Sequence, residues 1–392
     1  MTGDNRPLKV LHVAETSQGG VGSYLEEIVT CQVERYGSSR VRVVLPGEHA
    51  ALFQRLPPET LCPFTMAGAG RLICMLRMTR LAWGLVRRWQ PDVVHLHSSY
   101  AGLLRPLLAL MPGRPRVAYC AHGWAFDREG PRWLNWAIAK VEKACARSTD
   151  AVICISRHDQ ASALRAGMPP QRLVVVLNGV ADVPDPPPQP QTPATARWPE
   201  GRLRILFVGR LDRQKGVDVL YEALRRLGDR AAAIVVGAPV VAEEAGASVV
   251  PSNARAIGWT TRDQINDLYR SAQVLVVPSR WEGFGLVALE AMRCGCAVVA
   301  SRVGGLSEVV DNGVTGLLFE PGDAAGLATL LSTTSASKLA ALGAAGRQRF
   351  ERLFRIDRVD AELDALYRVM LAREPITACR SHAQGSTVAD GS

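Results

Sequence analysis

The chain has 392 residues, of which 47% are hydrophobic, and it carries a formal net charge of +9. This length exceeds one ordinary hydrophobic core and predicts two domains. The sequence has no run of about 18 apolar residues, and polar residues precede its first expected strand, which argues against a membrane span and a signal peptide. We therefore expect a cytoplasmic protein.

The excess of basic charge lies in the N-terminal half. Residues 1–182 carry 22 lysines and arginines against 14 acids, whereas 183–392 carry 24 against 23. Such a half can bind nucleic acid, an anionic membrane surface or a phosphorylated substrate. Within it, segment 71–89 interleaves arginines with apolar residues, which is typical of an interfacial amphipathic helix or of a core-packed helix with an arginine face. No recognition motif accompanies the charge, so we expect no nucleic-acid partner.

Short β-branched segments alternate with helical patterns and predict doubly wound parallel sheets. In the first half we expect strands at 9–14, 41–46, 93–98, 116–122, 151–156 and 174–178. In the second half we expect them at 204–210, 232–237, 254–259, 274–279, 297–301 and 316–319. The predicted fold is α/β, with two Rossmann-like domains that face a central cleft.

A proline-rich segment separates the two halves. Seven prolines between residues 183 and 201 cannot continue a sheet and predict an interdomain linker. We expect an N-terminal domain at 1–182 and a C-terminal domain at 202–373 with closing helices, the last of which packs back toward the N-terminal domain. From 374 the chain turns polar and small, which predicts a disordered tail at 374–392.

Cysteine and histidine patterns give no metal site. The nine cysteines are scattered through expected strands and helices, which is typical of reduced, mostly buried thiols. His95 and His97 alternate on an expected strand and share a face, but no third ligand accompanies them in the sequence. We therefore expect no bound metal.

Two motifs of the first half follow expected strands. The segment Gly19-Gly20-Val21-Gly22 lets backbone amides approach a phosphate at a helix N-terminus, although a tight strand-to-helix turn also explains it. It is neither a Walker loop nor a dinucleotide fingerprint. His122 follows another strand, where a histidine is often structural but is also a candidate to hydrogen-bond a reacting sugar.

The second half begins with a cationic loop. A strand ends at Gly209, and Arg210 and Lys215 follow in the loop before the next helix, which favours a diphosphate over solvated charges. No two aspartates lie two positions apart, so the short acidic clamp for a metal-bound diphosphate is missing. Arg210, Lys215 and helix N-termini would have to neutralise a leaving diphosphate instead.

Glu282 and Glu290 lie eight positions apart, with Gly283-Phe284-Gly285 and an expected helix from Leu286 between them. A mostly helical segment would place their Cα atoms on the order of 12 Å apart. A glycosidase pair needs roughly 5 to 9.5 Å between its carboxyl groups. The two acids therefore suit the two ends of one elongated ligand, an anion and a polyol, with solvated surface glutamates as the alternative.

Together these motifs resemble glycosyltransferase family 4, whose members are retaining enzymes of the two-Rossmann-domain GT-B type. The resemblance covers roughly residues 8–372. It rests on the glycine turn, His122-Gly123, Asn178-Gly179-Val180, Gly209-Arg210 with Lys215-Gly216, and the paired glutamates.

The resemblance implies a nucleoside diphosphate sugar, UDP- or GDP-linked, as co-substrate. In this family the residue matching Glu290 holds the donor ribose, and the one matching Glu282 faces the donor sugar. The neighbouring donor-binding positions are Gly283, Phe284, Gly285 and Leu286.

Further roles follow from the same resemblance. Arg210 and Lys215 would bind the diphosphate and stabilise it as it leaves, His122 would lie near the transferred sugar, and the backbone of Gly20 would meet the diphosphate. Family members usually need no metal, so the resemblance implies no cofactor.

The opening residues 10–15 and 19–24 are similar to bacterial members that build exopolysaccharide, capsule or O-antigen units of lipopolysaccharide. This similarity implies a polyprenyl-diphosphate-linked oligosaccharide acceptor, bound mainly by the N-terminal half, and peripheral contact with the anionic inner face of the cell membrane. The expected reaction is retaining transfer of a hexose to that acceptor. The alternatives are a nucleotide-sugar epimerase or phosphorylase of the same fold, and a non-catalytic binding subunit of a polysaccharide assembly complex.

Overall fold

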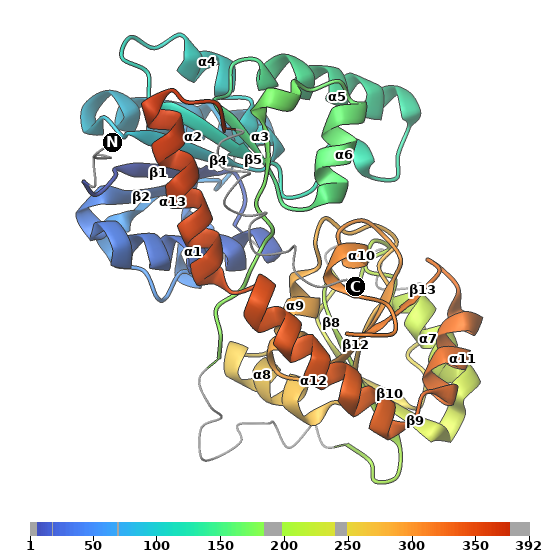
Figure 1. Cartoon of the computed structure of the whole chain (residues 1–392). Helices are drawn as coiled ribbons and strands as arrows, with labels where there is room; N and C mark the ends of the chain where they lie inside the picture. The colour runs from blue at the N-terminus through green and yellow to red at the C-terminus, as the bar shows by residue number, and fades with distance from the viewer. Residues whose placement is uncertain (1–5, 18, 69, 184–197, 240–248, 377–392) are drawn as a thin grey trace, which may run out of the picture. The chain divides into compact units, whose positions relative to one another are not determined.

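The computed structural model describes residues 6–17, 19–68, 70–183, 198–239 and 249–376. The chain divides into two compact units, one made of Met1–Asn178 with Ile356–Ser392 and the other of Gly179–Arg355 (Figure 1). Each unit is a parallel sheet covered by helices, so the predicted fold of two Rossmann-like domains is confirmed. Residues 184–197 of the expected linker and 377–392 of the expected tail lie outside the described residues.

In the described part of the first unit, seven parallel strands form one sheet in the order β3-β2-β1-β4-β5-β6-β7. They are β1 (Val10–Ala14), β2 (Val41–Pro46), β3 (Leu61–Phe64), β4 (Val93–His97), β5 (Arg116–Cys120), β6 (Ala151–Cys154) and β7 (Leu173–Val175). Strand β3, which contains Pro63, was not among the strands expected from the sequence. Proline is tolerated there because β3 is an edge strand.

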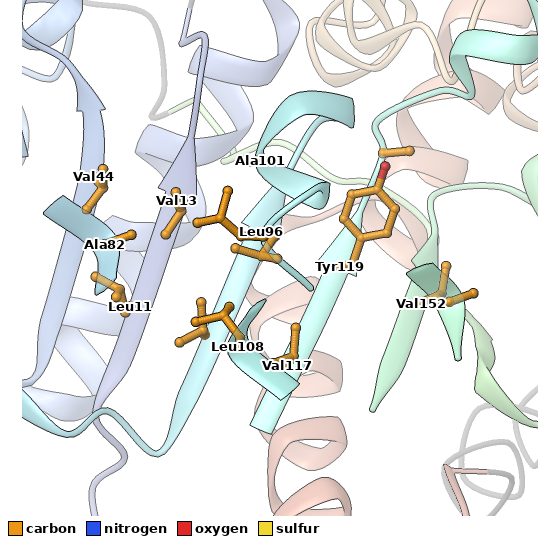
Figure 2. Close-up of a cluster of buried hydrophobic side chains, with 14 of the residues drawn as sticks. Leu11, Val13, Val44, Ala82, Leu96, Ala101, Leu108, Val117, Tyr119 and Val152 are labelled. Atoms are coloured by element: carbon orange, nitrogen blue, oxygen red, sulfur yellow. The ribbon is translucent and has the colours of Figure 1, made fainter. Parts of the chain in front are cut away.

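Helices cover both faces of this sheet. They are α1 (Gly20–Tyr36), α2 (Arg71–Trp89), α3 (Ser99–Gly102), α4 (Arg105–Ala109), α5 (Arg132–Ala146), α6 (Arg157–Arg165) and α13 (Ile356–Ala372). On one face, alternate residues such as Leu11, Leu96 and Tyr119 pack with Ala82 of α2 and Leu108 of α4 in a continuous apolar core (Figure 2). Helices α1 and α13 pack against each other on the opposite face, so the last described helix belongs to the first unit.

The second unit repeats the same winding. Among its described residues, six parallel strands follow the order β10-β9-β8-β11-β12-β13. The strands are β8 (Leu203–Val208), β9 (Ala231–Val236), β10 (Ala254–Gly258), β11 (Val274–Val277), β12 (Ala297–Ser301) and β13 (Leu317–Phe319). The helices are α7 (Val217–Leu227), α8 (Arg262–Ser271), α9 (Leu286–Arg293), α10 (Leu306–Val309), α11 (Ala324–Thr333) and α12 (Ala336–Leu353).

The strand orders locate the expected binding edge in each unit. Strand order reverses between β1 and β4 in the first sheet and between β8 and β11 in the second. In open α/β sheets, ligands bind outside the carboxyl ends of the strands at this reversal. A ligand-binding site is therefore expected at the loops after β1 and β4 in the first unit and after β8 and β11 in the second.

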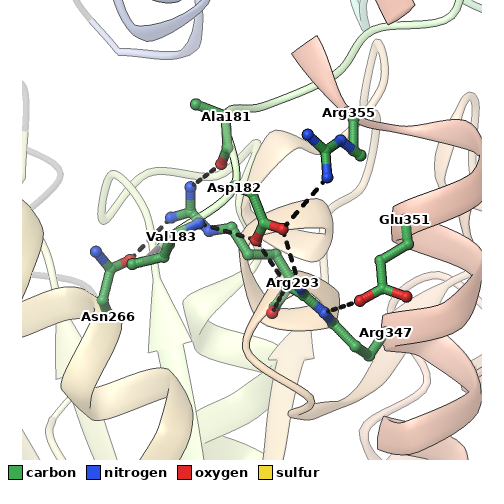
Figure 3. Close-up of polar contacts among 8 residues, drawn as sticks. All are labelled: Ala181, Asp182, Val183, Asn266, Arg293, Arg347, Glu351 and Arg355. Carbon is green, nitrogen blue, oxygen red and sulfur yellow. Dashed lines mark hydrogen bonds and ion pairs between the residues drawn. The ribbon is translucent and has the colours of Figure 1, made fainter. Parts of the chain in front are cut away.

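The segment that enters the second unit is held by an ion-pair network (Figure 3). Two guanidinium nitrogens of Arg347 donate to the two Asp182 oxygens over 2.7 and 2.9 Å, and Arg355 lies 3.8 Å from the same carboxylate. Arg293 donates to the carbonyl oxygen of Ala181 over 2.7 Å, and Val180 forms a bridge with Arg355. Both points at which the chain passes between units are thus anchored within the second unit.

Two expectations about the whole chain can be compared with the described residues. None of the described helices has both the length and the apolar character needed to cross a bilayer. Four of the eight cysteines that the structure describes, Cys120, Cys145, Cys154 and Cys296, are buried.

Candidate active site

The loops after β8 and β11 bring Lys215 and Glu282 together. The Lys215 Nζ atom lies 2.5 Å from Glu282 Oε2, and the Ser279 hydroxyl donates to the same oxygen over 3.2 Å. The side chains of Lys215 and Glu282 are 19% and 11% exposed, so the pair is largely shielded from water. Because β8 and β11 are neighbours in the sheet, 67 residues of sequence separation become a direct contact.

Arg210 lies at the start of the same loop and is more open. One of its guanidinium nitrogens is 2.9 Å from Asp212 Oδ2 and 2.7 Å from Gln214 Oε1, while 43% of the side chain is exposed. The Lys215 backbone N–H donates to the other Asp212 oxygen over 3.0 Å. Asp212 therefore orders the loop that carries both cations, a role that the sequence did not indicate.

The loop after Glu282 is packed closely against backbone. A Cβ atom at Gly304 would lie 2.0 Å from the Glu282 carbonyl oxygen, and one at Gly305 would lie 2.4 Å from that of Gly283. Gly285 has a φ of 89° and precedes α9, where a Cβ would meet Leu306 at 2.4 Å. Glycine is required at these positions because side chains would push the loop away from the sheet edge.

Helix α9 places Glu290 one turn beyond this loop. Its N-terminus has no side-chain cap, so the first amides of the helix face the site without a side-chain acceptor. Glu290 Oε2 accepts a hydrogen bond of 2.9 Å from the hydroxyl of Tyr269, a fully buried residue of α8. Since α9 begins only at Leu286, the separation estimated for a continuous helix between the two glutamates does not apply.

In the first unit, the glycine turn is the N-terminus of α1. Gly20 lies in the first turn of this helix. A Cβ at Gly22 would lie 2.0 Å from the Ser17 carbonyl oxygen, so the helix starts in close contact with the loop after β1. The turn therefore has a structural requirement for glycine in addition to its expected contact with a phosphate.

His122 follows β5 at the carboxyl edge of the first sheet. Its φ of 56° lies in the left-handed region, which is unusual for a residue with a side chain and is often found at functional sites. Burial lowers the pKa of His122 to about 4, so the ring is neutral near pH 7. Its Nε2 atom lies 2.9 Å from His97 Nδ1.

A third histidine joins the predicted pair on β4. His12 of β1 stands in register with His95, and ligand nitrogens of His12, His95 and His97 lie within 4.8 Å of one another. All three side chains are fully buried. The sequence could not show this third histidine, because the register of β1 against β4 is a tertiary contact.

The same edge holds an acid that sequence reasoning did not single out. Glu15, directly after β1, accepts hydrogen bonds from the Ser98 hydroxyl and, over 3.1 Å, from the Ala101 N–H. Burial raises the pKa of Glu15 even though these hydrogen bonds act in the opposite direction. Ser98 has a φ of 70°, so two residues at this edge, Ser98 and His122, hold the left-handed conformation.

Comparisons with known proteins identify the family. The family model described as "Glycosyl transferases group 1" matches residues 189–349, and the "Glycosyl transferase 4-like domain" matches 19–179. A D-inositol 3-phosphate glycosyltransferase of Geodermatophilus obscurus is 31% identical over 369 residues, which are 86% of this chain and 76% of the relative. The chain is a family-4-type glycosyltransferase.

Two further similarities concern less characterised relatives and the fold. An uncharacterised 41.2 kDa protein of the cps region of Klebsiella pneumoniae is 28% identical over 327 residues, which are 81% of this chain and 87% of the relative. The crystal structure of Anabaena HepE in complex with UDP-glucose has a TM-score of 0.75 at 21% identity, covering 91% of this chain and 98% of that one. This likeness shows a shared GT-B fold.

The second unit of the glycosyltransferase therefore gathers the predicted cations and acids, Arg210, Lys215, Glu282 and Glu290, at or beside the carboxyl edge of its sheet. The first unit places Gly20 and His122 at the corresponding edge of its own sheet. Neutral imidazole nitrogens can bind a metal, but in the histidine cluster most of them already have hydrogen-bond partners. The ligand roles of the predicted residues remain predictions.

Proposed function

We propose that this glycosyltransferase moves a hexose, with retention, from a UDP- or GDP-linked sugar to a hydroxyl of a polyprenyl-diphosphate-linked oligosaccharide. The observation that carries the proposal is the contact between Lys215 and Glu282 at the reversal point of the second sheet. In this contact the cation of Lys215 would serve a phosphate and the carboxylate of Glu282 would serve a sugar hydroxyl. Diphosphate sugars require both kinds of partner within a few ångströms.

The donor would lie along the loop from Glu282 to the start of α9. Lys215 and Arg210 would contact the diphosphate, and the first amides of α9 would add the positive end of a helix dipole. Glu290, held by Tyr269, would accept hydrogen bonds from the ribose hydroxyls. The complex of HepE with UDP-glucose supports a nucleotide-sugar donor for this fold.

Departure of the nucleoside diphosphate would be stabilised by the protein's own cations. Arg210 is held by Asp212 and Gln214 while 43% of its side chain stays exposed to a ligand, and Lys215 is positioned by Glu282. Fixed cations that meet developing negative charge need little reorganisation during the reaction. We propose that the enzyme works in this way without a metal cofactor.

The acceptor part of the proposal rests on the first unit. Exposed apolar side chains, among them Leu76 of α2, Leu110 after α4, and Trp133 and Trp136 of α5, accompany its excess of basic charge. This combination suits peripheral contact with an anionic membrane in which a lipid-linked acceptor resides. The relative in the cps region of Klebsiella pneumoniae supports a role in surface polysaccharide synthesis.

Calorimetric titration with UDP-glucose, GDP-mannose and ADP-glucose tests the donor site directly. We expect UDP-glucose or GDP-mannose rather than ADP-glucose to bind. Glu290→Gln and Lys215→Ala should weaken that binding about 10- to 100-fold, since each removes a hydrogen bond to a charged group. Glu222→Gln on α7 is the matched control, because Glu222 is an exposed acid that pairs only with nearby arginines in the described contacts. The Glu222→Gln variant should bind the nucleotide sugar with the affinity of the wild type.

Four results would contradict the proposal or a part of it. Full donor affinity in both site variants would remove the donor assignment, and a sugar that changes configuration in the absence of any acceptor would indicate an epimerase instead. Transfer that stops in EDTA and returns with a divalent cation would overturn the metal-free part. Absence of any nucleotide binding would favour the non-catalytic alternative.

A further inference from the structure

A row of polar side chains crosses what would otherwise be the apolar interior between the first sheet and helix α1. Gln32 of α1, His12 of β1 and His97 of β4 are each fully buried, and His122 follows at the sheet edge. Burying polar groups in a core is unfavourable unless each finds a hydrogen-bond partner. Their arrangement therefore requires an explanation that a structural packing role alone does not give.

The four side chains form one continuous chain of hydrogen bonds. His12 Nε2 lies 2.8 Å from Gln32 Oε1, and His12 Nδ1 lies 2.9 Å from His97 Nε2. His97 Nδ1 lies in turn 2.9 Å from His122 Nε2. Each of the two interior imidazoles uses one nitrogen toward Gln32 and the other toward His122, so the chain is complete from α1 to the sheet edge.

The rings are neutral, so each must use one nitrogen as donor and the other as acceptor. Burial lowers the pKa of His12 to about 4, and burial also lowers the pKa of His97 well below its usual value. In a chain of neutral imidazoles, the direction of one hydrogen bond sets the direction of all the others. The tautomer of His122 is thereby coupled to the Gln32 amide on a different element.

The Gln32 amide sets the direction. Its oxygen faces His12 Nε2, so that nitrogen carries the proton and His12 Nδ1 accepts from His97 Nε2–H. His97 Nδ1 then accepts from His122 Nε2–H, which leaves His122 Nδ1 with a free lone pair. The amide nitrogen of Gln32 is buried and has no hydrogen-bond partner among the described residues that meets full geometric criteria, although Gln32 counters the burial that raises the pKa of Tyr367.

We propose that this chain of hydrogen bonds fixes His122 as a hydrogen-bond acceptor at Nδ1 for a hydroxyl of the transferred sugar. Gln32, His12 and His97 are the positioning residues. The proposal rests on the proposed function for the identity of the ligand. Tyr24 supports the ring from its side, with an edge contact of 5.0 Å between ring centroids. An acceptor that faces the sugar discriminates against a ligand that lacks the hydroxyl, because a buried lone pair would stay unpaired.

Nitrogen-15 NMR of the histidine rings tests the proposal on the intact protein. At pH 7 we expect His12, His97 and His122 to be neutral with the proton on Nε2. Saturating UDP-glucose, GDP-mannose or ADP-glucose, whichever binds, should shift the His122 Nδ1 resonance, whereas the matching nucleoside diphosphate should not. A proton on His122 Nδ1, a sugar nucleotide that binds without moving this resonance, or stoichiometric zinc bound by the three histidines would each overturn the proposal.

A variant of Gln32 separates positioning from simple packing. Gln32→Leu removes the acceptor for His12 and should give a mixture of His122 tautomers and lower kcat on the order of tenfold with little change in KM. Tyr36→Phe is the control, because it removes the hydrogen bond from the Tyr36 hydroxyl of α1 to Asp364 of α13, which is not part of the chain of hydrogen bonds. An unchanged tautomer and kcat in Gln32→Leu would contradict the proposal.

Failure of the proposed function would look different. If no nucleotide sugar binds, the donor assignment fails, while the protonation pattern of the free protein still tests the hydrogen-bond chain. If a nucleotide sugar binds with the expected dependence on Glu290 but His122 carries its proton on Nδ1, only the further inference fails.

Discussion

Tyr269 shows how one buried hydroxyl orients the carboxylate of Glu290, the residue proposed to bind the donor ribose. It is fully buried on α8, and its only described hydroxyl contact is the 2.9 Å hydrogen bond to Glu290. Burial and the neighbouring carboxylate raise the pKa of Tyr269, so the phenol stays protonated and keeps donating. One Glu290 oxygen is thereby fixed, and the carboxylate is oriented before a ligand arrives.

Replacing Tyr269 by Phe should therefore weaken donor binding without removing the carboxylate. We expect a loss of affinity of about three- to tenfold, which corresponds to one hydrogen bond of about 0.5–1.5 kcal/mol. Titration calorimetry with the best-binding nucleotide sugar measures it. Tyr221→Phe on α7 is the matched control, since it removes a hydroxyl from another buried tyrosine of the same unit. Equal affinities in the two variants would show that Tyr269 does not orient Glu290.

The sequence indicated candidate site residues that lie within recognisable motifs. It did not indicate the buried residues that hydrogen-bond to them. Glu282, Lys215 and Glu290 were predictable, because glycines and strand ends mark their positions. Tyr269 and His12 were not, because each reaches its partner from a different element. A tyrosine within an amphipathic helix carries no local sign that its hydroxyl meets an acid 21 residues later.

At the scale of elements, one face of the first unit combines basic and apolar groups. Helix α2 buries Met78, Ala82 and Val86, yet it exposes Leu72 by 69% and Leu76 by 61%. Arg71 at its N-terminus donates to the hydroxyl of Tyr100 in α3, which joins α2 to the next helix on this face. One side of α2 therefore packs on the core, as one of the two predictions for segment 71–89 required, and the exposed side keeps apolar residues beside arginines. Its contact with a membrane stays a prediction.

Helix α5 provides the sharpest test of membrane contact. Trp133 and Trp136 are 70% and 65% exposed, and Lys140 lies 5.3 Å from the Trp136 ring centroid. The double variant Trp133→Ala/Trp136→Ala should lower binding to vesicles containing phosphatidylglycerol by about tenfold or more, because tryptophan favours the membrane interface. Vesicle sedimentation measures the change.

The control for this experiment is Trp259→Ala, because Trp259 is a comparably exposed tryptophan, 55%, in the second unit. It should bind vesicles as the wild type does. Binding of the wild type should also fall with added salt, since exposed charges are screened over about 10 Å at 0.1 M. Equal loss in both tryptophan variants would show that α5 has no special part in the contact.

Helices and strands of the core were largely predictable, since their periodicity is set by local burial. Segment 71–89 matches α2 at both ends, and segment 297–301 matches β12. The deviations have local causes. Strand β3 contains a proline that edge position tolerates, and α1 begins at Gly20 because glycines allow its first turn to pack against Ser17.

At the scale of the whole molecule, the chain leaves the first unit after Asn178 and returns to it at Ile356. The two Rossmann-like halves and the return of the last helix to the N-terminal domain were both expected, but the sequence could not show which residues of α13 contact the first sheet. That pairing depends on contacts such as the 2.7 Å hydrogen bond between Tyr367 and His95, which are 272 residues apart. Amphipathic periodicity reports that a helix has an apolar face, not which sheet covers it.

Asp182 is the residue on which the entry into the second unit depends (Figure 3). Burial would raise the pKa of Asp182, but hydrogen bonds from Arg347 and the Val183 N–H outweigh it and lower the pKa below its usual value. A carboxylate with a lowered pKa stabilises the fold above its unfolded-state pKa and loses that contribution only as the pH falls through the lower, folded value.

Replacing Asp182 by Asn should therefore destabilise the second unit by about 1–3 kcal/mol, because Arg347 and Arg355 lose a charged acceptor while shape is kept. The loss should be constant from pH 8 to pH 5, since the carboxylate stays ionised throughout this range. Hydrogen exchange followed by mass spectrometry in β11 and β12 measures it, and exchange in β1 and β4 serves as the internal reference. Asp229→Asn, which removes a 91% exposed partner of Arg202, is the matched control. A loss that already shrinks between pH 7 and pH 5 would show that the network does not hold the pKa of Asp182 down.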